Sequence, residues 1–405
     1  MTTKKKILLA PHNSKVAKHR IKLIRVTTHD VGLEELLKDQ LKFFKDSGFE
    51  SIGLAADTGR LKEIEENQGV RCINLPMQRE ISILKDLKSL WKMYRVFRNE
   101  RPDIVHANTP KGVLLSMIGG MLAQVPIRIY SVTGLRFETA TGFLKRILKW
   151  TERISCWCAT EVIPEGDGVS KVLKKERITN KPLRKIHFGN VGGVDLEYFN
   201  PTLFTKESHN FVRFIFVGRI TKDKGINELV NAFDQLHKEY SLTRLLLVGR
   251  FEEDLDPINE KVKERIMLGE GIEQAGYVKD IRPQLMSSDI LILPSYREGF
   301  PNVILQAGAM NLPVIITDVN GADEVIIPNV NGFIIPKQDT NAIIMAMKQV
   351  IDNPHLIPEM AKNCRGIIES KFDRKDVLRA TLERYRELLS KNKKTRKLLC
   401  NFETV

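Results

Sequence analysis

The chain has 405 residues, of which 42% are hydrophobic and 28% charged, and this suits two or three globular domains with full cores. It carries 64 Lys and Arg against 50 Asp and Glu, a net charge of +14, and residues 1–200 hold most of the excess with 35 basic and 22 acidic side chains. No run of 18 apolar residues occurs, which excludes a membrane-spanning helix, and the basic first half predicts an anionic partner such as a membrane surface or a phosphorylated substrate.

The first half alternates short apolar runs with helical patterns, after a basic tail at 1–20. The runs predicted as strands are 21–26, 51–55, 104–106 and 127–132, and the helical patterns are 36–44 and 113–122. Strands that alternate with helices of this length favour a parallel sheet with helices on both faces.

The second half repeats this organisation. Its predicted strands are 213–217, 244–248, 290–293, 314–316 and 332–335, and a helix is predicted at 226–240. We therefore predict an α/β protein with two doubly wound parallel-sheet domains. The expected divisions are a tail at 1–20, a first domain at 21–200, a second domain at 201–374, a terminal helix at 375–390 and a basic tail at 391–405.

A basic loop follows the strand predicted at 213–217 and precedes a helix. It contains Gly218, Arg219, Lys224 and Gly225. A helix N-terminus attracts anions through its dipole and its free N–H groups, and a guanidinium beside an ammonium suits a diphosphate. The loop therefore predicts an anion site, with a solvated basic turn as the alternative.

A second loop follows the strand predicted at 290–293 and precedes another helix and strand. It has the sequence Pro-Ser-Tyr-Arg-Glu-Gly-Phe-Pro-Asn over 294–302. Two apolar strands joined by a helix indicate a buried parallel sheet, in which ligands bind at the carboxyl ends of the strands. The alternative is an ordinary crossover with a solvated acid at Glu298.

Together the two loops resemble the donor-binding elements of family-4 retaining glycosyltransferases, which have the GT-B fold. That family carries Gly-Arg-x4-Lys-Gly, matched here from Gly218 to Gly225, and Glu-Gly-Phe-Pro-Asn followed by a second acid in a Glu-x7-Glu pattern. The resemblance covers most of the chain and is densest over 214–340. It implies two Rossmann-like domains that face a central cleft, and a nucleotide-diphosphate sugar, expected to be UDP-linked, as the donor.

The resemblance also implies roles for individual residues. Arg219 and Lys224 would hold the diphosphate and stabilise it as the leaving group, and Glu298 would contact the donor sugar. The second acid is replaced by Gln306, whose amide can still bind a ribose diol but without a charge-assisted hydrogen bond. Arg250 is expected to line the nucleotide cleft. The other donor-binding residues are Gly218, Gly299, Phe300, Pro301 and Asn302.

Polar residues also follow two strands of the first half, on the side expected to receive the acceptor. His106 ends one strand, and this segment is similar to a His-containing strand end of the family. Many family members carry a His where Thr133 stands, and that His reaches the donor sugar. His106 is either a cleft residue or a structural histidine, Thr133 can hydrogen-bond but carries no charge, and Arg136 either binds an acceptor phosphate or is solvated.

Two basic amphipathic helices are predicted in the first half, at 81–97 and 143–157. Such helices can lie in a membrane interface. The alternative is that their apolar faces pack on the sheet. The basic bias of the whole half favours contact with an anionic membrane surface, whereas no RNA- or DNA-binding signature or array of stacking aromatics points to nucleic acid.

The sequence is therefore interpreted as a retaining glycosyltransferase that acts on a lipid-linked or growing glycan of a bacterial surface polysaccharide. We expect it in the cytoplasm, peripheral at the inner face of the plasma membrane. No cofactor and no metal are expected, because the donor loops contain no Asp-x-Asp site. Two alternatives remain: a nucleotide-sugar epimerase of the same fold, and a catalytically weak partner subunit, suggested by Gln306 and Thr133.

Overall fold

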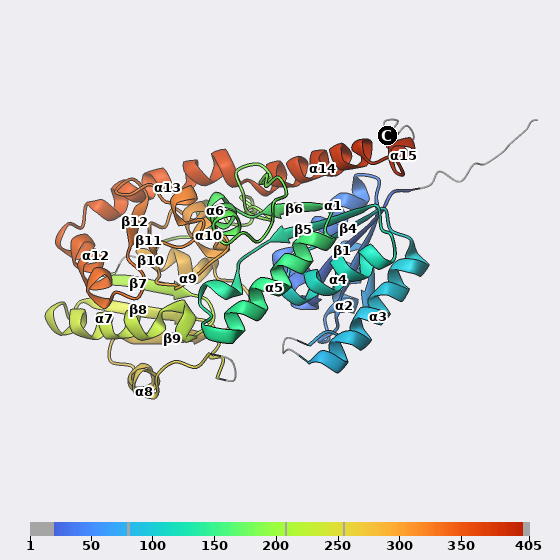
Figure 1. Cartoon of the computed structure of the whole chain (residues 1–405). Helices are drawn as coiled ribbons and strands as arrows, with labels where there is room; N and C mark the ends of the chain where they lie inside the picture. The colour runs from blue at the N-terminus through green and yellow to red at the C-terminus, as the bar shows by residue number, and fades with distance from the viewer. Residues whose placement is uncertain (1–19, 79–81, 207–208, 254–255, 400–405) are drawn as a thin grey trace, which may run out of the picture.

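The computed structural model describes residues 20–78, 82–206, 209–253 and 256–399, so the predicted tail lies outside the described residues up to position 19. Two six-stranded parallel sheets form the centres of two domains (Figure 1). The first sheet contains β1 (Lys22–His29), β2 (Glu50–Ala56), β3 (Arg71–Asn74), β4 (Ile104–Ala107), β5 (Ile127–Val132) and β6 (Glu161–Pro164). The second contains β7 (Val212–Val217), β8 (Thr243–Val248), β9 (Ile272–Gly276), β10 (Ile290–Leu293), β11 (Val314–Thr317) and β12 (Gly332–Ile335).

Both sheets have the same topology. The first has the strand order β3-β2-β1-β4-β5-β6, and the second has β12-β11-β10-β7-β8-β9, which is the same order when its strands are counted from β7. This is the doubly wound Rossmann arrangement, whose ligand crevice opens where the strand order reverses. The prediction of two doubly wound parallel-sheet domains is therefore confirmed. The reversal lies between β1 and β4 in the first domain and between β7 and β10 in the second.

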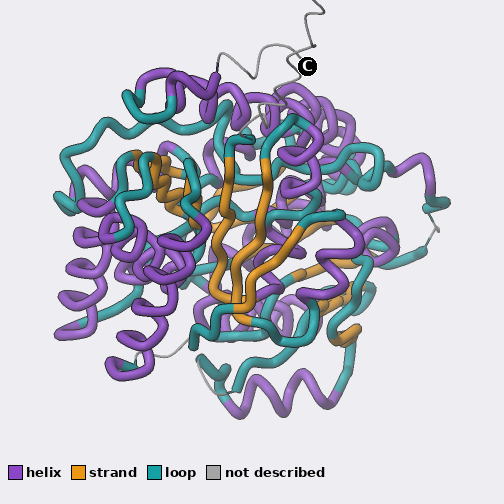
Figure 2. The backbone as a smooth tube through the Cα atoms, turned by 90° about the vertical axis from the view of Figure 1, so that its right-hand side faces the viewer, coloured by secondary structure: helices purple, strands orange, loops and turns teal. Residues whose placement is uncertain are grey.

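Helices cover both faces of the sheets (Figure 2). Those that follow strands of the first sheet are α1 (Gln40–Asp46), α2 (Leu61–Gln68), α3 (Ile83–Glu100), α4 (Pro110–Leu122), α5 (Gly142–Cys158) and α6 (Asp167–Lys175). The second domain has α7 (Ile226–Glu239), α8 (Glu260–Leu268), α9 (Arg282–Met286), α10 (Asn302–Ala309), α11 (Ala322–Val325), α12 (Thr340–Asp352) and α13 (Leu356–Phe372). None of the helices within the described residues is long and apolar enough to cross a membrane.

Helix α14 (Arg374–Lys391) follows the second domain but packs on the first, along the upper edge of Figure 1. Leu378, Tyr385 and Leu389 recur at helical spacing and are buried in one cluster with Ile21 and Leu23, at the start of the first sheet. Because these side chains form one face of the helix, their burial fixes α14 on the first domain.

The C-terminal segment differs from the basic tail predicted at 391–405. Lys391 closes α14, and a short helix α15 (Arg396–Leu399) follows it. Thr395 is buried and donates a hydrogen bond from its hydroxyl to the carbonyl of Leu389 at 2.9 Å, while Leu398 packs on the first core. The packed side chains of Thr395 and Leu398 hold this segment against the first domain. The many basic residues of the segment gave no indication of this packing.

Candidate active site

The two predicted donor loops meet at the reversal of strand order in the second sheet. One loop follows β7 and the other follows β10, and these strands are neighbours. Gly225 has a φ of 71°, and a Cβ there would overlap the carbonyl oxygen of Pro294. Glycine is therefore required at this position both for its backbone conformation and for the close approach of the loops.

An ion pair joins the two loops. Lys224 Nζ lies 2.5 Å from Glu298 Oε1, and both side chains are largely buried. In the first loop, Arg219 Nη1 donates to Glu252 Oε2 at 2.6 Å while its side chain stays 42% exposed. The arrangement leaves a guanidinium facing solvent beside a lysine that is paired with Glu298, so an entering diphosphate could be bound by both cations.

Asp223 lies between these two cations in the sequence and offsets part of the positive charge of the loop. Burial raises the pKa of its carboxyl, but the hydrogen bond from Thr221 and the charges of Arg297, Arg219 and Lys224 outweigh burial and lower it. Arg297 Nη2 lies 3.1 Å from Asp223 Oδ2. Asp223 is thus an ionised carboxylate that holds the second loop against the first.

The loop at 294–302, which we call the donor-sugar loop, contacts the first domain through its backbone. A Cβ on Gly299 would overlap the carbonyl oxygen of Thr133. Phe300 and Pro301 are buried, and the Phe300 ring packs on Phe372 at 5.5 Å between centroids. Asn302 begins α10, and its Oδ1 accepts a hydrogen bond from Asn190 Nδ2 at 2.6 Å.

The remaining predicted donor residues lie at the same edge of the second sheet. Gly218 directly follows β7, and its carbonyl oxygen is so close to Gly249 that a Cβ on Gly249 would overlap it. Arg250 lies over the Tyr277 ring at 4.2 Å, and the Tyr277 hydroxyl donates to Glu35 of the first domain at 3.4 Å. Gln306 is half-buried on α10, one turn from its start.

The predicted acceptor-side residues separate into two groups. His106 is buried: Arg25 Nη1 donates to the Tyr385 hydroxyl, and the His106 ring is hydrogen-bonded on both sides, through Nδ1 to Tyr385 Oη at 2.6 Å and through Nε2 to Ser131 Oγ at 2.6 Å. Burial, and next the charge of Arg25, lower the pKa of His106 well below its usual value, so it is neutral. The structure therefore shows His106 as a buried, neutral histidine with a hydrogen bond at each ring nitrogen.

Thr133 and Arg136 lie in the loop after β5, at the contact between the domains. The Thr133 hydroxyl donates to the carbonyl of Asn108 at 2.8 Å. Arg136 is exposed and begins a short 3₁₀ helix, Arg136–Glu138. Of the three predicted residues, Thr133 is the one that contacts the loop at 294–302, through its carbonyl oxygen beside Gly299.

Several residues that sequence reasoning missed link the domains across this cleft. Glu324, on α11, accepts from the backbone N–H of Asp167 at 2.7 Å and pairs with Lys185 at 2.8 Å. Asn320 donates to Glu138 at 3.1 Å. The position of Asn320 shortly after the strand predicted at 314–316 was a sequence signal. The other residues had none, because each is paired with a residue of the opposite domain that lies far away in the sequence.

Among the residues that the structure describes, no three His, Cys, Asp or Glu side chains gather into a group that could hold a metal ion. The charged groups at the donor loops form ion pairs, Arg219 with Glu252 and Lys224 with Glu298.

Two Rossmann domains that face each other, with a basic loop and a Glu-Gly-Phe-Pro-Asn loop at one reversal point, define a glycosyltransferase of the GT-B fold. Family models agree with this class: residues 212–353 match "Glycosyl transferases group 1", and residues 44–167 match "Glycosyl transferase 4-like domain". The chain belongs to this glycosyltransferase family, which also includes a relative that is 32% identical over 345 residues.

That relative is the capsular polysaccharide biosynthesis glycosyltransferase CapM of Staphylococcus aureus, and the match covers 83% of this chain and 90% of CapM. A second is the Escherichia coli UDP-Gal:alpha-D-GlcNAc-diphosphoundecaprenol alpha-1,3-galactosyltransferase, 28% identical, with 84% and 90% covered. These findings give no support to the epimerase alternative.

Solved structures share the fold. A glycosyltransferase from Rickettsia africae aligns with a TM-score of 0.73 at 22% identity, covering 92% of this chain and all of that one. Anabaena Alr3699/HepE, solved in complex with UDP, aligns with a TM-score of 0.72 at 19% identity, with 91% and 100% covered. At these identities the likeness supports the GT-B arrangement of the two domains.

Proposed function

We propose that the chain is a retaining glycosyltransferase that transfers a sugar from a UDP-sugar to a lipid-linked or growing glycan of a bacterial surface polysaccharide. The observation that carries the proposal is the Lys224–Glu298 pair at the reversal point of the second sheet, with Arg219 on the same loop. UDP as the carrier is supported by the name of the Escherichia coli relative and by the UDP complex of the Anabaena protein.

Charge placement suggests how these residues would act. The diphosphate would lie against Lys224 and Arg219, so that the negative charge released as the sugar C1–O bond breaks is neutralised. Glu298, freed from Lys224 by the diphosphate, would accept hydrogen bonds from the sugar. The acceptor hydroxyl would form its bond to C1 on the face that the diphosphate leaves and give its proton to a diphosphate oxygen, which preserves the anomeric configuration.

The acceptor is proposed from the chemistry of the relatives. The printed name of the Escherichia coli relative specifies a diphosphoundecaprenol-linked sugar, and that of CapM specifies capsular polysaccharide. A lipid-linked acceptor would enter from the first domain, where Thr133 meets the donor loop. The enzyme would then act in the cytoplasm, peripheral at the inner face of the plasma membrane.

The exposed side chains of α3 and α5 support a membrane-facing surface. Both helices flank α4 on the first domain (Figure 1). Leu84 is 83% exposed and Phe143 75%, and Trp91 and Trp150 are more than half exposed. We call these side chains, with their neighbours Ile83, Leu87, Leu144, Ile154 and Trp157, the apolar surface. The alternative, that the apolar faces pack on the domain, holds for Met93 and Phe97 of α3, which are buried in its core, but not for the exposed side chains of the apolar surface.

Basic side chains accompany the apolar surface. Lys85, Lys88 and Arg146 are exposed, and Arg95 lies over the Trp91 ring at 4.8 Å. Aromatic rings beside cations are suited to the interface of an anionic bilayer, where the rings insert among the acyl chains and the cations bind headgroups. An anionic membrane is therefore the proposed partner of this surface.

Trp91→Ser/Trp150→Ser is expected to lower binding to phosphatidylglycerol vesicles at least about tenfold, because two large apolar side chains no longer insert. Co-sedimentation with vesicles measures this. The matched control is Leu242→Ser/Met345→Ser, which removes two exposed apolar side chains from the second domain. Equal vesicle binding by both double variants would show that the surface contacts no membrane.

A catalytically weak nucleotide-sugar-binding subunit is the second candidate. Gln306 stands where the family pattern has an acid, and the Thr133 hydroxyl is engaged with the Asn108 carbonyl. Transfer by a Gln306→Glu variant, but not by the native chain, would favour this candidate. Transfer by the native chain would remove it.

A thermal-shift panel of nucleoside diphosphates tests the donor site. A ligand that binds only the folded state stabilises it by about 2.7 kcal/mol at a hundredfold excess over its dissociation constant. We expect UDP to raise the melting temperature of the native chain but not of Arg219→Ala/Lys224→Ala. No shift with any nucleotide would contradict the assignment.

A further inference from the structure

Glu165 is a buried acid at the domain contact for which the proposed function has no role. It directly follows β6, whose last residue, Pro164, pairs with Val132 of β5. Thr133 directly follows Val132, and its carbonyl oxygen is the atom that contacts Gly299 of the donor loop. Glu165 therefore lies one strand away from the point where the first domain touches the donor-sugar loop.

The residues around Glu165 bring the second domain against it. A Cβ on Gly166 would overlap Glu324 Oε1 and lie 3.1 Å from the Phe300 ring, and a Cβ on Gly189 would lie 2.5 Å from the Glu165 carbonyl oxygen and 3.0 Å from the same ring. Because Gly166 and Gly189 have no side chains, Phe300 of the donor-sugar loop can pack directly against the backbone around Glu165. Asn190, next in the chain, binds Asn302 of that loop.

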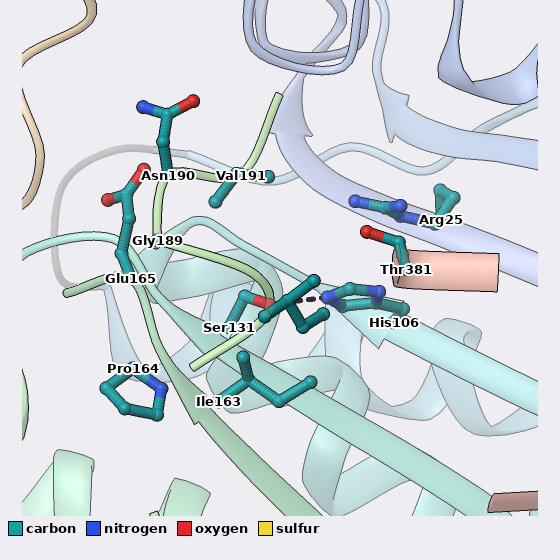
Figure 3. Close-up of a pocket in the computed structure, with 11 residues that line it drawn as sticks. Arg25, His106, Ser131, Ile163, Pro164, Glu165, Gly189, Asn190, Val191 and Thr381 are labelled. Atoms are coloured by element: carbon teal, nitrogen blue, oxygen red, sulfur yellow. Dashed lines mark hydrogen bonds between the residues drawn. The ribbon is translucent and has the colours of Figure 1, made fainter. Parts of the chain in front are cut away.

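Glu165 also borders a small recess in the first domain with a cavity volume of about 20 Å³, room for about one water molecule or one hydroxyl group (Figure 3). Arg25, His106 and Ser131 line the recess as well. His106 Nε2 and Ser131 Oγ are hydrogen-bonded to each other at 2.6 Å. Arg25 is fully buried, and its Nε has no hydrogen-bond partner among the described residues. The recess is therefore lined by polar groups that could bind a hydroxyl.

The charge state of Glu165 follows from the groups that face it. Burial raises its pKa to about 8, the Glu298 and Glu324 carboxylates contribute to the increase, and the backbone N–H of Val191 acts against it. Glu324 is itself held by Lys185 and by the N–H of Asp167, and Arg25 and His106 face the recess from the opposite side. At neutral pH the Glu165 carboxyl is protonated and can donate a hydrogen bond.

We propose that Glu165 is a specificity residue that binds a hydroxyl of the donor sugar across the domain contact. Glu298, as a carboxylate, only accepts hydrogen bonds, whereas the Glu165 carboxyl both donates and accepts. The two acids, one from each domain, therefore offer complementary partners to the sugar. This inference rests on the proposed donor site, since it places the sugar between Glu298 and the first domain.

The test compares steady-state transfer by Glu165→Gln and Glu165→Leu with the native chain. Glu165→Gln keeps a neutral donor and acceptor, so kcat and the donor KM at pH 7 stay within about threefold. Glu165→Leu removes both and raises the donor KM roughly ten- to a hundredfold, while UDP, which lacks the transferred sugar, binds as to the native chain. The native rate falls above pH 8 as Glu165 ionises, and Glu165→Gln abolishes that fall.

Glu152→Gln is the matched control, because Glu152 is also a buried acid of the first domain but is hydrogen-bonded to Tyr130 away from the cleft. It leaves the donor KM unchanged. Weakened UDP binding in Glu165→Leu, equal damage by Gln and Leu, or a rise in the acceptor KM alone would each overturn the proposal. UDP binding by the native chain tests the donor site separately.

Discussion

Lys224→Ala is expected to lower the rate of sugar transfer roughly 10²- to 10³-fold, the cost of removing one preorganised group that stabilises developing charge. Lys224 Nζ lies 2.5 Å from Glu298, the acid proposed to contact the sugar. The substitution removes the charge that would bind the diphosphate. Transfer of labelled sugar from a UDP-sugar to a lipid-linked acceptor measures the effect.

Lys222→Ala is the control, because Lys222 belongs to the same 3₁₀ turn, Lys222–Lys224, but is exposed. It is expected to keep native activity. Lys224→Ala also leaves Glu298 without its counter-ion and could destabilise the fold. The melting temperatures of both variants must therefore be measured and shown to lie above the assay temperature. A folded Lys224→Ala protein with native activity would show that this lysine does not hold the leaving group.

Gly299→Ala is expected to lower transfer about 100-fold, with UDP binding unchanged within about threefold. The added Cβ would overlap the Thr133 carbonyl, a backbone atom that cannot move aside as a side chain can. The domains would then meet out of position, and a displacement of about 1 Å at reacting groups costs about 10²-fold in rate. Calorimetric titration with UDP and the transfer assay separate the two effects.

Gly366→Ala controls for the substitution itself. Gly366 lies within α13, and a Cβ there would meet no atom within 4 Å. This variant is expected to be fully active and slightly more stable, because alanine favours a helix over glycine. Native activity in Gly299→Ala would contradict the contact between Thr133 and the donor loop as a condition for transfer.

Nine of the twelve strands could be predicted, because the central strands of parallel sheets are short all-apolar runs. β10, for example, is buried along its whole length. The three that were missed, β3, β6 and β9, are edge strands. An edge strand has one neighbour and a partly exposed face, so β3 and β9 mix polar with apolar residues and lack a clear pattern.

The donor loops could be predicted because their residues are consecutive and follow recognisable strands. The partners of those residues could not, since they come from distant positions: Glu252 pairs with Arg219, and Asn190 with Asn302. Glu165 was overlooked because β6 was overlooked, although the apolar run at Val162 and Ile163 after a predicted helix was a signal. His106 was left open between two roles because burial depends on α14, more than 270 residues away in sequence.

The most direct measurement is the anomeric configuration of the product made by the native chain from a UDP-sugar and a diphosphoundecaprenol-linked acceptor, determined by NMR. Departure of a diphosphate held by Arg219 and Lys224, with attack from the same face, predicts a new glycosidic bond with the configuration of the donor. An inverted product, or no transfer to a lipid-linked acceptor in the presence of a UDP-sugar that binds, would contradict the proposed reaction.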